Sequence, residues 1–172
     1  MVSFVDELAA AEIGATFNFY REGPRANLLK RRLRRYLAAR KAAPLLLVGE
    51  AAGYRGARTS GLPFTSERQL TGAGPAEATA TIVRRTLAEL ELEEETLCWN
   101  VVPTHPGDET SNRAPTRAEI AAGLLFLEQL ARGRLVLAVG RVAAAATGAP
   151  YVRHPSHGGA AAFSATLRRC LS

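Results

Sequence analysis

The chain has 172 residues, of which 47% are hydrophobic and 22% charged, and its formal net charge is +6 at pH 7. This is an ordinary globular composition, and the length predicts one domain over residues 1–172. No apolar run approaches the roughly 20 residues of a membrane helix, so we expect no membrane partner. The first residues include acids and no basic segment, which argues against a signal peptide.

The two cysteines, Cys98 and Cys170, lie far apart in the chain. Two such cysteines give neither a disulfide framework nor the spacing of a metal site, so we expect no metal and a reducing, cytoplasmic location. The positive charge favours a polyanionic partner, chiefly nucleic acid. A genome biased toward Arg and Ala codons would produce the same composition, so charge alone does not decide between these explanations.

Taken in chain order, apolar periodicity and flanking residues predict helices and strands that alternate. We expect helices over 3–14, 26–42, 75–92, 116–132, 141–149 and 161–171, and strands over 44–49, 95–103, 133–140 and from 151 onward. This alternation is typical of a three-layer α/β/α sandwich around a central, mostly parallel four-stranded sheet.

The helix expected over 26–42 has an apolar face and an intensely basic one. Leu29, Leu33 and Leu37 recur every four residues, which places them together toward the core. The basic face fits a contact with a DNA backbone and fits a solvated helix surface equally well.

Ligands of parallel α/β sheets bind beyond the carboxyl ends of the strands. Polar residues gather there in this sequence: Glu50, Asn100, His105, Arg141 and His154. The glycine-rich stretch after the first strand, "GEAAGYRGARTSGLPFTSE", lacks the Lys-Ser or Lys-Thr of a Walker loop and does not run directly into a helix as a dinucleotide-binding turn does. We therefore expect no nucleotide cofactor.

Four segments at strand ends, "GEAAG…GLPFTSE", "WNVVPTHP", "SNRAPT" and "RHPSHGG", together resemble the uracil-DNA glycosylase superfamily, most closely its family 4 branch. The resemblance departs from that branch at three points. The chain lacks the four cysteines of the iron–sulfur cluster, Ala52 stands where the first motif usually has proline, and His157, Gly158 and Gly159 follow the His-Pro-Ser turn in place of a bulky apolar wedge.

The resemblance implies roles for the base-binding and catalytic residues. Glu50 would orient the attacking water, and His154 would donate a hydrogen bond to uracil O2 as negative charge grows there. Phe64 would stack on the flipped base, and the Asn100 amide would match uracil N3–H and O4. The small residues Ala51 and Gly53 would admit the nucleotide and leave room beside uracil C5.

Each of these residues also has a structural explanation. Glu50 could pair with Arg55 or Arg58, Phe64 could fill the core under its loop, Asn100 could satisfy local backbone groups, and His154 could be a turn histidine bonded to backbone. For contacts to DNA phosphates, the expected residues are Ser66, Arg153, Ser156, His157 and Gly158.

The activity that follows is excision of uracil from DNA by a monomeric, monofunctional enzyme that leaves an abasic site. No lysine lies in the expected pocket, which argues against a Schiff-base step. A glycosylase for another deaminated or mismatched base remains open, as does a non-catalytic DNA-binding protein on the same scaffold.

Overall fold

The computed structural model describes residues 3–172, whose helices and strands largely alternate along the chain. In order they are α1 (Phe4–Ala10), α2 (Ala26–Ala39), β1 (Leu45–Ala51), α3 (Ala57–Ser60), α4 (Glu67–Thr71), α5 (Ala78–Glu89), β2 (Thr96–Val102), α6 (Arg117–Ala131), β3 (Leu135–Val139), α7 (Arg141–Thr147), β4 (Tyr151–Val152) and α8 (Ala160–Leu171). None of the helices described is long and apolar enough to cross a membrane.

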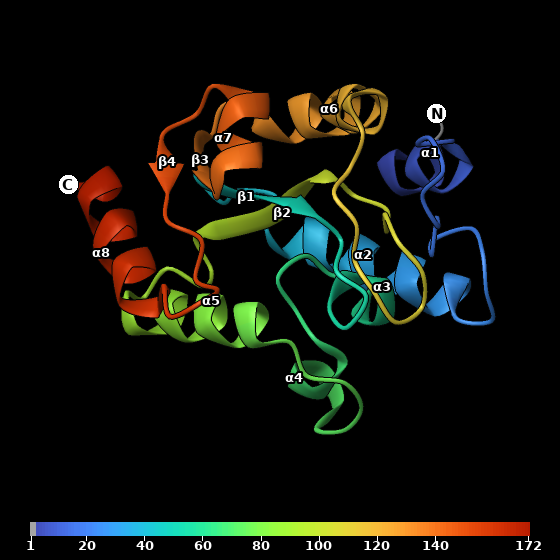
Figure 1. Ribbon diagram of the computed structural model, residues 1–172, viewed down its shortest axis with the longest axis horizontal. Helices are drawn as coiled ribbons and strands as arrows, with labels where there is room; N and C mark the ends of the chain where they lie inside the picture. The colour runs from blue at the N-terminus through green and yellow to red at the C-terminus, as the bar shows by residue number, and fades with distance from the viewer. Residues whose placement is uncertain (1–2) are drawn as a thin grey trace.

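The four strands form one sheet in the order β2–β1–β3–β4, and every neighbouring pair is parallel. Figure 1 shows α6 and α7 on one side of this sheet and α5 on the other. The predicted three-layer α/β/α sandwich is confirmed. Gly49 of β1 is in register with Asn100 of β2, so the carboxyl ends of these two strands lie side by side.

Alternate residues of β1 face two different apolar clusters, as the pleat of a strand requires. Leu46 and Val48 pack with residues of α1, α2, α6 and α7. Leu45 and Leu47 pack with residues of α5 and α8. All four are buried, and each such side chain contributes about 1.5–3 kcal/mol on leaving water. This double-sided burial makes β1 a rigid base for the residues that follow it.

Most boundaries differ from those predicted by one to three residues, and α5, expected over 75–92, is three residues shorter at each end. The first helix ends at Ala10, because Ala11 turns to extended backbone and Ile13 then packs into the core. The helix α2 ends at Ala39, three residues early. The glycine-rich stretch was expected to be loop, but it contains the short helix α3, and the short helix α4 begins at its last residue.

Two of the basic residues of α2, Arg32 and Arg34, and the two arginines that flank the helix, Arg25 and Arg40, make ion pairs within the chain. Arg32 bonds both carboxylate oxygens of Glu67, and Arg25 just before α2 binds the same carboxylate. Further along α2, arginines pair with acids of other segments: Arg34 with Asp6 and Arg40 with Glu94. These pairs hold neighbouring segments in place, whereas no ion pair of Lys30, Arg31 or Arg35 is found within residues 3–172, so the face has a structural part and a part that is free for an anionic partner.

Candidate active site

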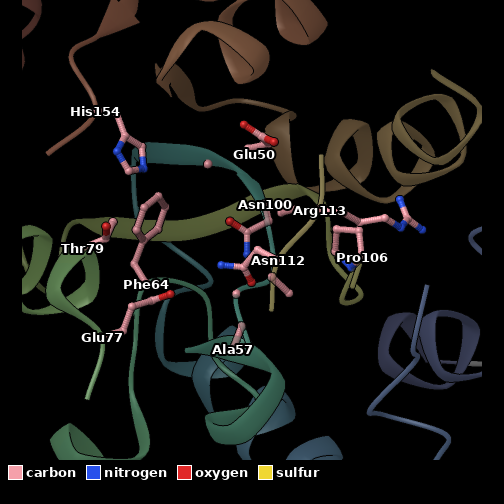
Figure 2. Close-up of a pocket in the computed structure, with 14 residues that line it drawn as sticks. Glu50, Ala57, Phe64, Glu77, Thr79, Asn100, Pro106, Asn112, Arg113 and His154 are labelled. Carbon is pink, nitrogen blue, oxygen red and sulfur yellow. The ribbon is translucent and has the colours of Figure 1, made fainter. Parts of the chain in front are cut away.

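A cavity of about 240 Å³ lies at the carboxyl ends of β1 and β2. Figure 2 shows the residues that line it, among them all six that the sequence predicts for base binding and catalysis: Glu50, Ala51, Gly53, Phe64, Asn100 and His154. They come from the end of β1, the loop after it, the middle of β2 and the turn after β4. The parallel sheet is what brings these distant segments to one edge.

Gly49 allows Phe64 and Asn100 to approach the same strand. A β-carbon at Gly49 would lie 2.6 Å from Phe64 Cζ and 2.7 Å from Asn100 Oδ1, closer than real contacts permit. The missing side chain therefore lets the aromatic ring and the amide stand together in the cavity wall. A planar ligand can stack on the first while its edge faces the second.

Phe64 has a backbone φ of +48°, which is unusual for a bulky residue. Such strain persists only where the surroundings fix it. Here the Ser60 hydroxyl donates to the carbonyl of Thr65 at 2.7 Å, and Tyr20 donates to the carbonyl of Gly61 at 2.9 Å. Both ends of the segment that carries Phe64 are thus anchored, and the ring is held at the cavity.

The Asn100 side chain is 5% exposed and comes from a strand whose every residue is buried. Within residues 3–172 no hydrogen bond to its amide is found. The amide atoms are not sealed from solvent, because the cavity that Asn100 lines reaches them. The expectation that Asn100 satisfies local backbone groups is not met, and its donors and acceptor are free to face a ligand.

His154 is held in one tautomer by the turn that follows it. The backbone N–H of Ser156 donates to His154 Nδ1 at 3.1 Å, so Nδ1 is an acceptor and a neutral ring carries its proton on Nε2. Burial, together with the charges of Arg153 and His157, lowers the pKa of His154 below its usual value. The side chain is therefore a neutral hydrogen-bond donor at pH 7.

Glu50 is half-buried at the end of β1, and desolvation raises its pKa above the usual value for a glutamate. Arg58 pairs instead with Glu109, and no ion pair of Glu50 is found in the part of the chain that the structure describes. The carboxylate is thus not used as a structural partner of a nearby arginine.

A second, more open hollow of about 570 Å³ adjoins the first, and both are lined by Glu50 and His154. Its other side chains include Arg141, Tyr151 and Arg153. Glu50 and His154 therefore stand at the junction between an enclosed pocket and a groove with two cations.

Ala52, which replaces the proline expected in the first motif, is tied at both backbone groups. Its N–H donates to the carbonyl of Val102 at 3.2 Å, and its carbonyl lies 2.7 Å from His105 Nδ1. His105 is fully buried. These bonds restrain the loop where the ring of a proline would otherwise do so.

Four polar residues line the cavity without having been predicted there: Glu77, Thr79, Asn112 and Arg113. Asn112 accepts a hydrogen bond from the Tyr54 N–H at 3.0 Å, which turns its amide NH₂ toward the cavity. Asn112 and Arg113 belong to "SNRAPT", so this motif was the signal for them. Nothing local in the sequence marks Glu77.

The residues predicted to contact DNA phosphates divide into two groups. Arg153 and Ser156 line the second hollow, and His157 and Gly158 are exposed beside it in consecutive left-handed conformations. Ser66 does not join them. It is fully buried, and its hydroxyl bonds Gln69 in the capping box of α4, so it does not reach a phosphate in this structure.

The two cysteines do not fit a four-cysteine iron–sulfur cluster. Cys98 is buried within β2 and Cys170 lies on α8. Over residues 3–172, no three His, Cys, Asp or Glu side chains gather as a metal site would require.

Comparisons with known proteins bear on this geometry. The sequence model of the uracil DNA glycosylase superfamily matches residues 37–168. The crystal structure of wild-type SMUG2 from Pedobacter heparinus is similar with a TM-score of 0.68 at 13% identity, over 99% of this chain and 97% of that chain, a likeness that concerns the fold. A comparison with curated protein sequences finds no match.

Proposed function

This chain belongs to the uracil DNA glycosylase superfamily, and from that premise we propose that it flips uracil out of DNA and hydrolyses its N-glycosidic bond, leaving an abasic site. Membership makes it a DNA glycosylase, a hydrolase of base-excision repair. The choice of uracil and the monofunctional mechanism are our proposal, as are the roles of individual residues and a monomeric state.

One observation carries the proposal. A neutral histidine with its proton on Nε2 and an amide that makes no hydrogen bond within residues 3–172 line the same cavity, and an aromatic ring lines it with them (Figure 2). Uracil has a hydrogen-bond acceptor at O2, a donor at N3 and an acceptor at O4. Its planar ring can also stack on an aromatic side chain. His154, Asn100 and Phe64 supply the matching groups.

The proposed reaction begins when uracil, extruded from the duplex, stacks on Phe64. The glycosidic bond then breaks, and its electron pair passes to the base, where O2 takes up negative charge. The Nε2–H of His154 stabilises that charge without giving up its proton. Water adds to C1′ as its proton passes toward the ionised Glu50, and the departing base gains a proton at N1 from solvent.

The test is an oligonucleotide carrying one uracil, incubated with the protein and then treated with alkali, which cleaves at abasic sites. We expect cleavage at the uracil position in single- or double-stranded substrate. Protein that unfolds cooperatively yet cleaves neither would contradict the proposal. Hypoxanthine, xanthine and thymine substrates of the same sequence separate it from a glycosylase for another base.

Two substitutions distinguish catalysis from DNA binding alone. His154→Ala and Glu50→Ala should lose excision while the affinity for uracil-containing DNA changes little. A non-catalytic DNA-binding protein would give salt-sensitive binding without product in every form, unchanged by either substitution. A looser loop at Ala52, where the family usually has proline, would favour that alternative, but hydrogen bonds at both backbone groups of Ala52 restrain the loop, so the alternative has less support.

A further inference from the structure

A carboxyl group lines the cavity and makes no hydrogen bond or ion pair within residues 3–172. Glu77 is the N-cap residue of α5, where a side chain normally accepts a hydrogen bond from the first turn of the helix. Here it makes no such bond, and it reaches into the cavity instead (Figure 2). Desolvation raises the pKa of Glu77, and no donor or cation offsets that effect.

Two glycines make room for this carboxyl group. A β-carbon on Gly53 would collide with Glu77 Oε1, and one on Gly56 would collide with Oε2. The Glu77 carboxyl therefore fills the volume that a side chain on Gly53 would occupy. Tyr54, the next candidate to close this space, is not among the lining residues, and the guanidinium of Arg55 lies over its ring, 5.2 Å from the centroid.

The next step rests on the proposed function. With O2 of a flipped uracil at His154 and its N3 and O4 at Asn100, the edge that remains is the one carrying C5. Gly53 and Glu77 line the cavity next to each other, and in this orientation of the base they are the residues that the C5 edge would face. In Figure 2, Glu77 lies on the opposite side of the cavity from Glu50 and His154, remote from where the sugar would enter.

We propose that Glu77 is a specificity-determining residue, which occupies the space beside C5 of the flipped base and so excludes thymine, whose methyl group needs that space. Two physical effects act together. The methyl group would collide with the carboxyl oxygens, and it would further desolvate a carboxyl group for which no donor is found in the described residues.

The experiment compares the wild-type protein with Glu77→Ser and Glu77→Gln. Serine is a favoured N-cap residue, so the first variant removes the carboxyl group without weakening α5. Glutamine keeps the volume. Glu89→Ala is the matched control, since Glu89 is a carboxylate of the same helix whose side chain is 54% exposed. Substrates are single-stranded oligonucleotides that differ only in one uracil or thymine, which removes any effect of base pairing.

Two readouts are taken for each protein: excision rate, and affinity for the same oligonucleotides with cleavage-resistant 2′-fluoroarabino nucleotides. For wild type we expect uracil to be preferred. In Glu77→Ser the uracil-to-thymine ratio should fall by about 10-fold or more, within the roughly 10–200-fold that a single methylene is worth in a pocket. Glu77→Gln and Glu89→Ala should keep the wild-type ratio within about 3-fold.

An unchanged ratio in Glu77→Ser in both readouts would overturn the assignment, as would a wild-type protein that accepts thymine as well as uracil. If wild type cleaves no uracil, the proposed function fails by itself. The binding ratios then still decide whether Glu77 sets the choice of base.

Discussion

At the scale of single residues, Glu50 and His154 have pKa values displaced in opposite directions, and both displacements suit pH 7. Burial raises the pKa of Glu50 above 4.5 and lowers that of His154 below 6.5. The two values are thereby drawn toward each other, yet near neutral pH the carboxylate remains ionised and the imidazole neutral. Both groups change state only as the solution becomes acidic, so acid is where activity should fail.

Glu50→Gln tests the carboxylate directly. We expect kcat to fall by about 10²–10⁴-fold, because the amide has no charge to orient water or balance the cationic sugar. In the wild type, kcat should fall as pH drops through the raised pKa of Glu50, and the variant should lose that dependence. The measurement is single-turnover excision between pH 4 and 8. If the variant lost activity over the same acidic pH range as the wild type, the pH dependence would come from a group other than Glu50.

Gly49→Ala tests the close approach of ring and amide at β1. The added methyl meets Phe64 Cζ and Asn100 Oδ1 well inside contact distance, so one of them must move out of the site. We expect at least about a 100-fold loss of kcat/KM, together with a stability loss of about 1–3 kcal/mol from overpacking. Urea unfolding separates the two effects. Wild-type kcat/KM in the variant would show that the site does not need this geometry.

At the scale of elements, Glu119 on α6 fixes the loop that carries Asn112. Its carboxylate binds Arg113 through two hydrogen bonds of 2.8 and 2.6 Å and accepts from the N–H of Thr116 and of Ala15. One buried side chain thus joins α6, the loop before it and the segment after α1. These bonds hold the pKa of Glu119 at about 2.

This arrangement predicts a defined loss of stability in acid. With a folded pKa of about 2 and an ordinary value of 4.5, Glu119 binds a proton only in the unfolded chain between these limits. Its contribution is therefore complete above about pH 4.5 and is lost as pH falls toward 2. The difference in unfolding free energy between wild type and Glu119→Gln should shrink over that range. Glu93→Gln, at an exposed site, should show no such trend.

The elements themselves were largely readable from the sequence, and the exceptions have physical reasons. The apolar run at Leu45–Val48 predicted β1, and the helix expected over 116–132 is present as α6, which opens with a capping box of Thr116 and Glu119. The helix α4 was missed although Ser66 and Gln69 form a capping box, because five residues between glycines give no periodicity to detect.

The candidate site was predictable where it lies at strand ends and not where it depends on a distant contact. Glu50 and Asn100 follow from their places on β1 and β2. Glu77 does not, since its position in the cavity depends on the missing side chains of Gly53 and Gly56, more than 20 residues earlier in the chain. Ser66 shows the opposite case. It was predicted to contact DNA because it lies in a motif, but its hydroxyl is buried and bonds Gln69.

At the scale of the whole molecule, both the net charge of +6 and the groove formed by the second hollow beside the cavity bear on how the protein binds the DNA backbone. Part of the positive charge is neutralised within the chain, as in the pairs of Arg32 with Glu67 and Arg40 with Glu94. Arg141 and Arg153 differ, since they line the groove that meets the cavity at Glu50. A strand whose base enters the cavity would place its backbone along that groove.

These two arginines should therefore account for a measurable share of the salt dependence of binding. Each phosphate contact that releases a counterion adds about 0.7–0.9 to the slope of log K against log salt concentration. Arg141→Ala and Arg153→Ala should each reduce the magnitude of this slope by the amount that one phosphate contact contributes. The affinity should fall similarly for DNA with and without uracil. Arg31→Ala, at an exposed position of α2 outside both hollows, carries the same charge change and should leave the slope nearly unaltered. Equal effects from all three substitutions would mean that DNA responds to total charge, and the groove would then have no special part in holding the backbone.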